Sequence, residues 1–362
     1  MTARRRLTVG VTGMNARADN PGPGMAVVRS LRASGRFDLR IVGLGYDALD
    51  PGLYHEDCDA TYLLPYPSTG QDALKERLLD IHGIEGLDAL IPCLDAELPS
   101  LVSLSPALED AGIRLYLPDE TRLQMRDKSR LPELAKAAGV ACPETKTVTQ
   151  SGFFHSAPRD GWAYPFVVKG PFYDAQIVHD PDEGVAAFRR ISAAWGLPLL
   201  VQKLVPGEEY NLSAVGDGEG HLLGTVMMKK RALTDKGKAW AGVCVRDQAL
   251  SDTADALAKA LRWRGPLELE LMRDPSGRYN LIEINPRFPA WIYFSVGVGR
   301  NLPELLLARM MGMDPEPLPE ALVGTMFIRH AQELIVSPQS FETMMIHGAL
   351  APGVAREGES HE

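Results

Sequence analysis

Two polar residues at strand-like spacing in the last third of the chain could bind a metal ion. Glu283 and Asn285 alternate with Ile282 and Ile284 within residues 281–287. Because side chains alternate between the two faces of a strand, both polar groups are expected on one face and the isoleucines on an apolar floor. Carboxylate and amide oxygens are the ligands that Mg²⁺ or Mn²⁺ accepts beside phosphate oxygens.

A second strand-like segment, residues 267–272, places Glu268 and Glu270 on one face, opposite three leucines. The turn signal at 275–277 would fold this segment back onto the first, and the spacing of Glu270 and Glu283 suits a short hairpin. Three carboxylates and one amide would then converge. The alternative is an amphipathic sheet whose acidic face is only solvated, which is common in antiparallel sheets.

Basic and apolar segments upstream favour the metal-binding interpretation. In chain order they are a basic stretch at 126–128 before a helix, an apolar strand that ends at Lys169, and an apolar strand at 199–205 that runs into a turn with Glu209. Followed by the acidic segments and Arg287, this order resembles the ATP-grasp superfamily. The resemblance covers most of the chain, and its Glu-x-Asn-x-Arg signature is specific.

The resemblance implies an α/β protein with a Rossmann-like N-terminal domain followed by a two-lobed ATP-grasp fold. The expected units are a Rossmann-like pre-ATP-grasp domain at 1–118, a small lobe at 119–200, a large lobe with the metal site at 201–335, and a C-terminal extension at 336–362 whose end is expected to be disordered. ATP and Mg²⁺ or Mn²⁺ are the implied cofactors.

The phosphate and metal positions of the family carry over residue by residue. Lys128 and Lys169 match the two lysines that hold the ATP phosphates, a task suited to a compact point charge. Arg287 would lie beside the transferring phosphate or the acyl phosphate, so Lys169 and Arg287 are the expected catalytic residues. Glu268 is expected to have a supporting role. The expected metal ligands are Glu270, Glu283 and Asn285.

The adenine and ribose positions carry over in the same way. Gln202 matches the position that faces the adenine amino group. The backbone of Lys203 and Val205 would bond the edge of the base. Glu209 matches the acid that accepts hydrogen bonds from the ribose hydroxyls.

One segment departs from the family pattern. After the second lysine, many members carry a glycine- and serine-rich loop whose backbone N–H groups cover the phosphates. Residues 170–175 of this chain hold one glycine and two aromatic residues instead. We therefore expect a shorter and stiffer lid, or a contribution of Tyr173 to the enclosure of the substrate.

The composition is that of an ordinary soluble globular protein, with 45% hydrophobic and 23% charged residues among 362. A net charge of −9 without a long basic run argues against nonspecific nucleic-acid binding. No apolar run approaches the roughly 18 residues that a membrane span needs. The four cysteines are scattered without zinc-like spacing, which favours free thiols in a cytoplasmic protein. The expected partners are small-molecule carboxylate and amine substrates, and a homodimer is left open.

The N-terminal third alternates short apolar runs with helical patterns, which indicates parallel βαβ units. A dinucleotide site at the first turn is a weak alternative, because the G-x-G-x-x-G spacing is missing. Ligands of open α/β sheets bind at the carboxyl ends of strands, so residues 14–15 and 93–97 should face the cleft, although Asp95 or Glu97 could equally begin a helix. The expected strands are 7–12, 39–44, 60–63, 87–92 and 113–117, and the expected helices are 25–33, 71–82 and 97–111.

The rest of the chain offers fewer decisive patterns. Lys229, Lys230 and Arg231 are either surface residues or contacts to an anion, and the sequence leaves this open. Trp240 and Trp291 are either core residues or aromatic surface beside the substrate. The expected elements are helices at 128–138 and 301–311 and strands at 222–230 and 240–245, the strands being joined by a polar loop.

These expectations predict an ATP-dependent, ADP-forming ligase that joins a carboxylate to an amine, with an amino acid or peptide as substrate. The carboxylate would attack the γ-phosphate to give an acyl phosphate, and the amine would then release phosphate. This reaction mainly requires that the negative charge on the phosphates and the leaving group be neutralised, and it requires no side-chain nucleophile. The alternatives are an enzyme that phosphorylates bicarbonate, like carbamoyl-phosphate synthetase or biotin carboxylase, and a nucleotide-binding regulator without catalysis.

Overall fold

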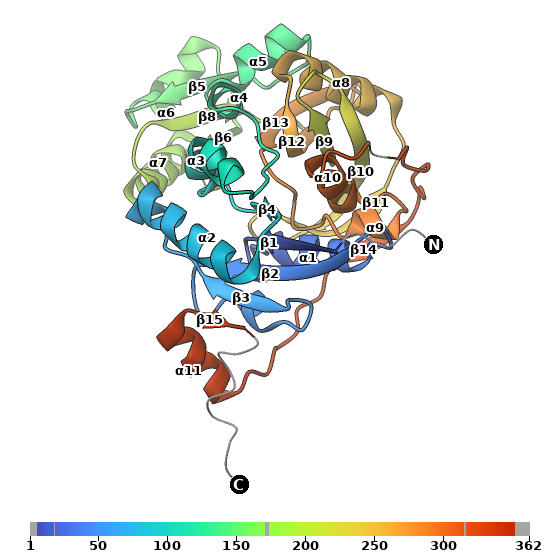
Figure 1. Ribbon diagram of the computed structural model, residues 1–362. Helices are drawn as coiled ribbons and strands as arrows, with labels where there is room; N and C mark the ends of the chain where they lie inside the picture. The colour runs from blue at the N-terminus through green and yellow to red at the C-terminus, as the bar shows by residue number, and fades with distance from the viewer. Residues whose placement is uncertain (1–5, 18, 171–173, 315, 352–362) are drawn as a thin grey trace.

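Three β-sheets organise the chain in the computed structural model, which describes residues 6–17, 19–170, 174–314 and 316–351. A five-stranded sheet lies at the bottom of Figure 1, a four-stranded sheet at the upper left and a six-stranded sheet at the upper right. Helices cover these sheets. The predicted α/β class, with a parallel N-terminal sheet followed by two lobes, is confirmed.

The N-terminal sheet has the strand order β15-β3-β2-β1-β4. Its strands β1 (Arg6–Val11), β2 (Asp38–Gly45), β3 (Ala60–Leu63) and β4 (Ala89–Ile91) run parallel. This topology agrees with the predicted βαβ units. The accompanying helices are α1 (Gly24–Arg32), α2 (Gln71–Glu85) and α3 (Leu98–Asp110), with short 3-10 helices at Pro51–Tyr54 and Pro67–Thr69.

The predicted strand at 113–117 is wrong. Arg114 makes a single parallel bridge to Ala89, and the chain then crosses toward the six-stranded sheet. There the Tyr116 hydroxyl donates to the carbonyl oxygen of Asp217 at 3.1 Å. A strand needs several consecutive pairs, and this segment contacts two sheets instead of extending one.

The chain returns to the N-terminal sheet after residue 336. Helix α11 (Pro338–His347) leads into β15 (Ala349–Leu350), which pairs antiparallel with β3. Leu63 N–H and the Arg77 guanidinium both donate to the carbonyl oxygen of Gly348, each at 2.9 Å. The predicted extension is thus attached to the N-terminal sheet through residue 351, while its predicted disordered end lies outside the described residues.

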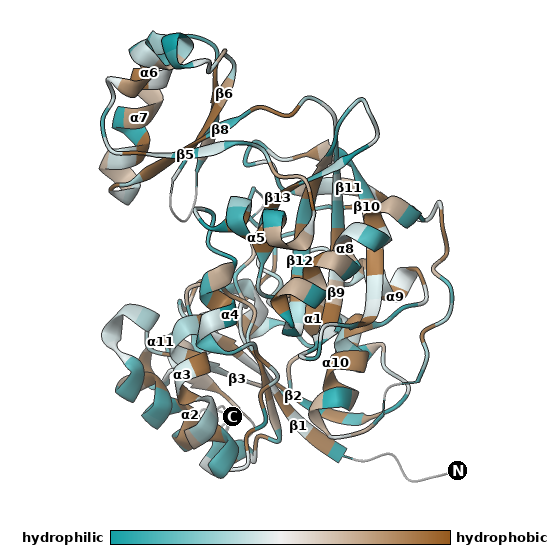
Figure 2. Cartoon of the chain, turned by 90° about the horizontal axis from the view of Figure 1, so that it is seen from above, coloured by the Kyte–Doolittle hydropathy of each residue, from teal (hydrophilic) through white to brown (hydrophobic). Residues whose placement is uncertain are grey.

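The four-stranded sheet forms a small lobe that projects from the rest of the molecule (Figure 2). Its order is β5-β8-β6-β7, from β5 (Thr145–Val148), β8 (Leu199–Lys203), β6 (Phe166–Lys169) and β7 (Ala175–Val178). Its helices are α6 (Phe153–Ser156), a 3-10 helix at Ala157–Asp160, and α7 (Pro181–Trp195). The proposed limit of this lobe at residue 200 falls inside β8, so a limit after β8 suits the sheet better.

The six-stranded sheet is antiparallel throughout, in the order β13-β12-β9-β10-β11-β14. Its strands are β9 (Glu208–Asp217), β10 (Leu222–Leu233), β11 (Ala239–Cys244), β12 (Arg264–Arg273), β13 (Tyr279–Asn285) and β14 (Met326–Ile328). The remaining helices are α4 (Glu120–Met125), α5 (Leu131–Ala138), α8 (Gln248–Leu261), α9 (Phe294–Gly297) and α10 (Leu302–Met310).

Both faces of the six-stranded sheet are covered near its centre. Leu269 and Leu281 pack with α8 residues such as Leu257, whereas Val226 and Met228 belong to a cluster shared with α10 and the N-terminal sheet. Helix α5 lies beside α8. It begins at Leu131 and not at residue 128 as predicted, because residues 127–130 form a turn in which Asp127 accepts from Arg130 and Leu131.

Candidate active site

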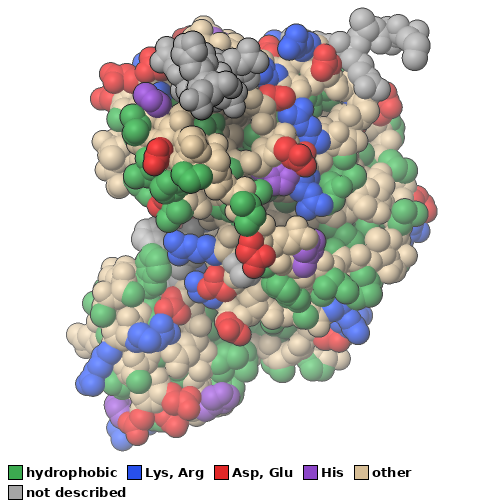
Figure 3. Space-filling view, turned by 90° about the horizontal axis from the view of Figure 1, so that it is seen from below, with side chains coloured by type: hydrophobic (Ala, Val, Ile, Leu, Met, Phe, Trp, Pro, Cys, Tyr) green, Lys and Arg blue, Asp and Glu red, His purple; other side chains and the backbone are tan. Residues whose placement is uncertain are grey.

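The β12–β13 hairpin pairs its polar residues directly across the two strands. Glu268 lies opposite Asn285, and Glu270 lies opposite Glu283. The predicted hairpin is therefore formed, with its carboxylates and amide on one face. Glu283 on this face interacts through its charge with Lys169, which ends β6 of the small lobe. The molecule narrows where that lobe projects from the rest, as the view from below shows (Figure 3).

A β-bulge interrupts the hairpin next to the acidic pair. Glu270 pairs with Glu283, but Leu271 pairs with Leu281, so Ile282 has no partner in register. The prediction that Ile282 and Ile284 share an apolar floor is wrong, because a bulge re-aims a side chain. Ile284 is buried in the core, whereas Ile282, which directly precedes Glu283 in the sequence, is only partly buried.

The amide of Asn285 is fixed between two carboxylates. Its Nδ2 donates to Glu268 Oε2 at 2.9 Å and to Glu270 Oε1 at 3.0 Å. The carbonyl oxygen of this amide is then the atom that remains for a cation. Together with the carboxylates of Glu270 and Glu283 it makes a set of hard oxygen ligands, which fits Mg²⁺ or Mn²⁺. Among the described residues no cluster of three or more His, Cys, Asp or Glu is arranged for a metal, so the proposed site depends on the amide as a third ligand.

Glu268 is occupied by donors and lies deeper than the other acids. Its Oε1 accepts from Asn211 Nδ2 at 2.6 Å and from Trp291 Nε1 at 2.7 Å, in addition to the bond from Asn285. Burial and the charge of Glu270 raise the pKa of the Glu268 carboxyl. These bonds support the proposed supporting role. Trp291 is thus a core residue that orients an acid, and the sequence had left its position open.

Glu270 remains ionised despite its burial. Burial opposes the charge, but Lys230 and Lys238 and the hydrogen bond from Asn285 hold the pKa of Glu270 well below its ordinary value. An ionised carboxylate and a fixed amide oxygen on one face are what a divalent cation requires.

Both lysines expected at the phosphates interact with this hairpin, Lys128 at ion-pair distance and Lys169 through its charge. Lys128 lies in the turn before α5, with its Nζ 3.3 Å from Glu283 Oε1. Lys169 ends β6 in the small lobe and is 9% exposed. Burial lowers the pKa of Lys169, against the opposing charge of Glu283. Cations from two different segments therefore meet the acidic face.

The predicted adenine segment follows β8. Gln202 is buried, and its Nε2 donates to Thr145 Oγ1 at 3.0 Å. The N–H of Lys203 donates to the Glu144 carbonyl oxygen at 3.0 Å, so any contact of this residue with a base has to use another group. Val205 lies beyond the end of β8 and stays proposed as a backbone contact.

Glu209 stands at the start of β9, after a turn that requires glycine. Gly207 has φ +154°, and a Cβ there would collide with the carbonyl oxygen of Arg273. This close approach brings the start of β9 against the end of β12, where Met272 is the partner of Glu209. The Glu209 carboxylate accepts from Lys230 Nζ at 2.9 Å.

Strand alternation separates the two adjacent lysines that the sequence could not distinguish. Lys230 points to the acidic face, where its side chain is 4% exposed and its Nζ lies 3.4 Å from Glu270 Oε2. Lys229 points away, where it pairs with Glu208 at 2.6 Å. Lys230 is therefore part of the site, and Lys229 is on the surface.

The N-terminal sheet reaches the site through the loop after β4. Asp95 Oδ2 accepts from Arg287 Nε at 2.8 Å, and its Oδ1 lies 3.7 Å from Arg126 Nη1. Glu97 is fully buried and accepts from the N–H groups of Cys93 and Leu94, which holds the loop in shape. Of the residues 93–97 predicted to face the cleft, Asp95 contacts Arg287, whereas Glu97 is buried and structural.

Several residues of the site were missed or given no role. Asn211 is a buried polar residue of β9 between Tyr210 and Leu212, and its polarity within that stretch was the available signal. Arg126 lies in the basic stretch at 126–128, and the sequence alone does not indicate its interaction with Asp95. The predicted lid residues 171–173, which include Tyr173, lie outside the described residues.

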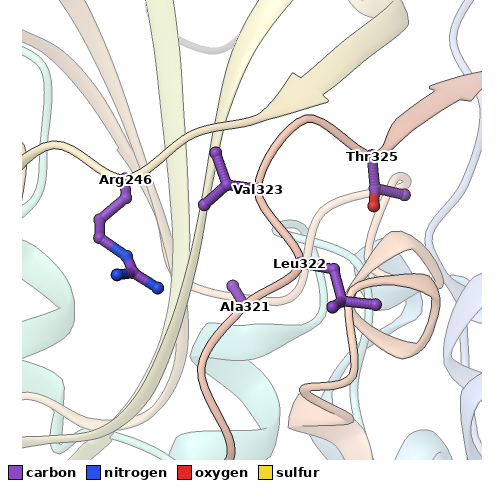
Figure 4. A pocket seen from close by; sticks show the side chains of 5 residues that line it. All are labelled: Arg246, Ala321, Leu322, Val323 and Thr325. Carbon is purple, nitrogen blue, oxygen red and sulfur yellow. The ribbon is translucent and has the colours of Figure 1, made fainter.

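A surface pocket elsewhere contains none of the predicted site residues. It is lined by Arg246, Ala321, Leu322, Val323 and Thr325, whose side chains come from the segments that flank β11 and β14 (Figure 4). No helix in the described part of the chain is both long and apolar enough to cross a membrane. The four cysteines are free thiols, as predicted.

Comparison with protein families matches residues 197–332 to a family described as ATP-grasp in the biosynthetic pathway with Ter operon. The matched segment contains β9 to β13 and Arg287, and therefore most of the acidic face. No curated protein matches the chain.

Solved structures resemble the chain over most of its length. L-amino acid ligase from Bacillus licheniformis has a TM-score of 0.62 and 17% identity, covering 86% of this chain and 75% of that one. N5-carboxyaminoimidazole synthetase from Staphylococcus aureus, complexed with ADP, has a TM-score of 0.65 and 14% identity, and the match covers 88% of this chain and 81% of that one. A third similar structure is the biotin carboxylase domain of 2-oxoglutarate carboxylase from Hydrogenobacter thermophilus, a dimer in complex with MgADP, ADP and bicarbonate. Its TM-score is 0.63 at 17% identity, and the match covers 85% of this chain and 70% of that one. At these identities the similarity establishes the fold.

Proposed function

We propose, on the premise that this chain is an ATP-grasp protein, that it is an ATP- and Mg²⁺-dependent ligase that forms ADP, activates a carboxylate as an acyl phosphate and joins it to an amine. The observation that carries the proposal is the ion pair of Lys128 with Glu283 of the acidic hairpin, near the buried Lys169, whose charge interacts with the same carboxylate. Anionic ligands for a metal and cations for phosphates, set against each other, suit a nucleoside triphosphate.

Each part of the nucleotide has its own proposed contacts. Lys128 and Lys169 would hold the phosphates, and Glu209 would accept from the ribose hydroxyls. Gln202 and the backbone of Lys203 and Val205 would border the base. Glu270, Glu283 and Asn285 would hold the metal, which when bound offsets phosphate charge.

Arg287 would act where the substrate carboxylate meets the γ-phosphate. A carboxylate oxygen attacks phosphorus, the bond to the bridging oxygen of ADP breaks, and ADP leaves with the electron pair. The Arg287 and Lys169 cations stabilise the negative charge of this exchange. An amine nitrogen then attacks the acyl carbon, phosphate leaves, and the amine gives up a proton.

The amine acceptor and the amino-acid class of substrate are the finer part of the proposal. Their support is the similarity to an L-amino acid ligase together with Asp95, a carboxylate beside Arg287 that could face a cationic group. Bicarbonate is the second candidate carboxyl substrate, because one similar structure was solved with bicarbonate bound.

The test is release of ADP from ATP with a panel of amino acids and with bicarbonate, followed by mass spectrometry of the products. With a carboxylate substrate but no amine, hydroxylamine should trap a hydroxamate. Oxygen-18 in the substrate carboxylate should appear in the released phosphate. Stoichiometric AMP and pyrophosphate would refute the proposed reaction, and turnover with bicarbonate alone would favour the second candidate.

A further inference from the structure

Lys230 makes three polar contacts from a nearly buried position. Its Nζ lies 2.9 Å from Glu209 Oε1 and 3.4 Å from Glu270 Oε2, and it donates to the Gly237 carbonyl oxygen at 3.2 Å. Burial alone would lower the pKa of Lys230, but the charges of Glu270 and Glu209 raise it above its ordinary value. The ammonium is therefore a fixed cation among these groups.

The two carboxylates that Lys230 joins have different proposed tasks. Glu209 is on β9 at the ribose side of the proposed site, and Glu270 is on β12 at the metal side. Without a cation between them, two buried or half-buried carboxylates on neighbouring strands would repel each other. Their relative position therefore depends on the ammonium of Lys230.

The third contact fixes the connection between β10 and β11. Lys230 contacts the loop 234–238 near its end, through Gly237, and Asp19, in the segment before α1, contacts its first half. Thr234 Oγ1 donates to the Asp19 carbonyl oxygen at 3.1 Å, and Lys236 Nζ lies 2.7 Å from Asp19 Oδ2. The next residue after Gly237 is Lys238, whose charge acts on both Glu270 and Asp95.

We infer that Lys230 is a positioning residue of the nucleotide site, which sets the distance between the ribose acid Glu209 and the metal acid Glu270 and holds the loop 234–238 against that site. This inference rests on the proposed function, because it assumes that both acids serve ATP. Lys230 touches no reacting atom. It acts through the two acids and through the loop that carries Lys238.

The neighbouring lysine supplies a matched control. Lys229 also pairs with a glutamate, Glu208, at 2.6 Å, but these side chains are 23% and 54% exposed. The variants are K230M and K229M, each of which removes one ammonium and keeps a long apolar side chain. K230Q serves as a second neutral variant if K230M does not fold.

Three measurements separate positioning from a general structural role. Calorimetry gives the affinity for ATP with Mg²⁺ in the absence of substrate, and thermal unfolding shows whether each variant is folded. Hydrogen exchange of residues 234–238, measured without nucleotide, reports the loop. K230M should weaken ATP binding about tenfold or more, as for loss of a buried charge-assisted contact, and should speed loop exchange. K229M should do neither.

The outcomes are distinct. A folded K230M or K230Q that binds ATP like the wild type overturns the inference, even if its loop exchanges faster. Equal losses of ATP affinity in K230M and K229M also overturn it, because the loss would then follow from removing any one positive charge. A wild-type protein that binds no ATP would refute the proposed function itself, and the inference with it.

Discussion

Arg287 Nε lies 2.8 Å from Asp95 Oδ2, across 192 positions of sequence. The arginine follows β13 of the large lobe, and the aspartate lies in the loop after β4 of the N-terminal sheet. The N-terminal sheet thereby sets the direction of the arginine proposed to act on the transferring phosphate. A bond from a guanidinium to a carboxylate is charge-assisted and directional, which suits this task.

Replacing Asp95 with Asn should reduce turnover while MgATP still binds. A neutral amide attracts the Arg287 guanidinium less strongly than the Asp95 carboxylate does, so the orientation of the Arg287 side chain is no longer fixed. We expect kcat to fall about tenfold or more, the loss of one charge-assisted bond, with the Kd for ATP within about threefold of the wild type. The matched control is E320Q, which removes the carboxylate of the exposed Arg246 pair and should leave both values unchanged. An unchanged kcat in D95N would contradict this assignment.

The same pair should give the stability a defined dependence on pH. Burial opposes the charge of Asp95, but Arg287 and Arg126 outweigh it and keep the pKa of this carboxyl below its ordinary value. A lowered folded-state pKa stabilises the fold above the unfolded-state pKa of about 3.9, and this contribution is lost as pH falls through the folded value. The difference in Tm between wild type and D95N should therefore shrink below about pH 4. A difference that grows in acid would argue against the ionised pair.

Changes in the proposed metal ligands should abolish ADP formation and leave the fold intact. In E283Q the amide removes the negative charge offered to the cation, and in N285A the oxygen ligand itself is lost. We expect ADP release to fall by at least about a hundredfold, in the range of losing a preorganised electrostatic contact. Thermal unfolding and circular dichroism check the fold. Turnover near that of the wild type at saturating Mg²⁺ would show that the metal site is misassigned.

Removing the ribose acid should affect ATP affinity more than turnover. Contacts to the ribose are the same in the ground state and the transition state, so E209A should raise the KM for ATP with a much smaller change in kcat. The adjacent Glu208, paired with Lys229 on the surface, gives the control E208A. If E209A and E208A have the same KM for ATP, Glu209 does not contact the nucleotide.

The sequence determined those parts of the site that depend on neighbours in the chain. Alternation in 267–272 and 281–287, with a turn between them, was enough to predict the hairpin and its facing acids, because a short hairpin has few alternative registers. The apolar pattern also predicted the short strand that ends at Lys169, whereas the role of this lysine was implied only by the resemblance to the ATP-grasp superfamily. The parallel N-terminal sheet followed from the regular succession of apolar runs and helical patterns.

Local patterns failed where backbone irregularity or a distant partner decided the outcome. The bulge at Ile282 breaks the simple alternation, and nothing in the residue types marks it. The segment 113–117 has the composition of a strand but finds only one pairing partner beside β4.

Only the tertiary structure decided which charges meet. Lys229 and Lys230 are identical as residues, and the position of β10 between β9 and β11 assigns one to the surface and the other to Glu209 and Glu270. The pair of Asp95 and Arg287 likewise depends on how the N-terminal sheet packs against the large lobe. The physical reason is that strand periodicity is a local property of the backbone. The partner of a charge depends instead on long-range packing, which brings together segments that are far apart in the chain and show no local pattern that predicts their contact.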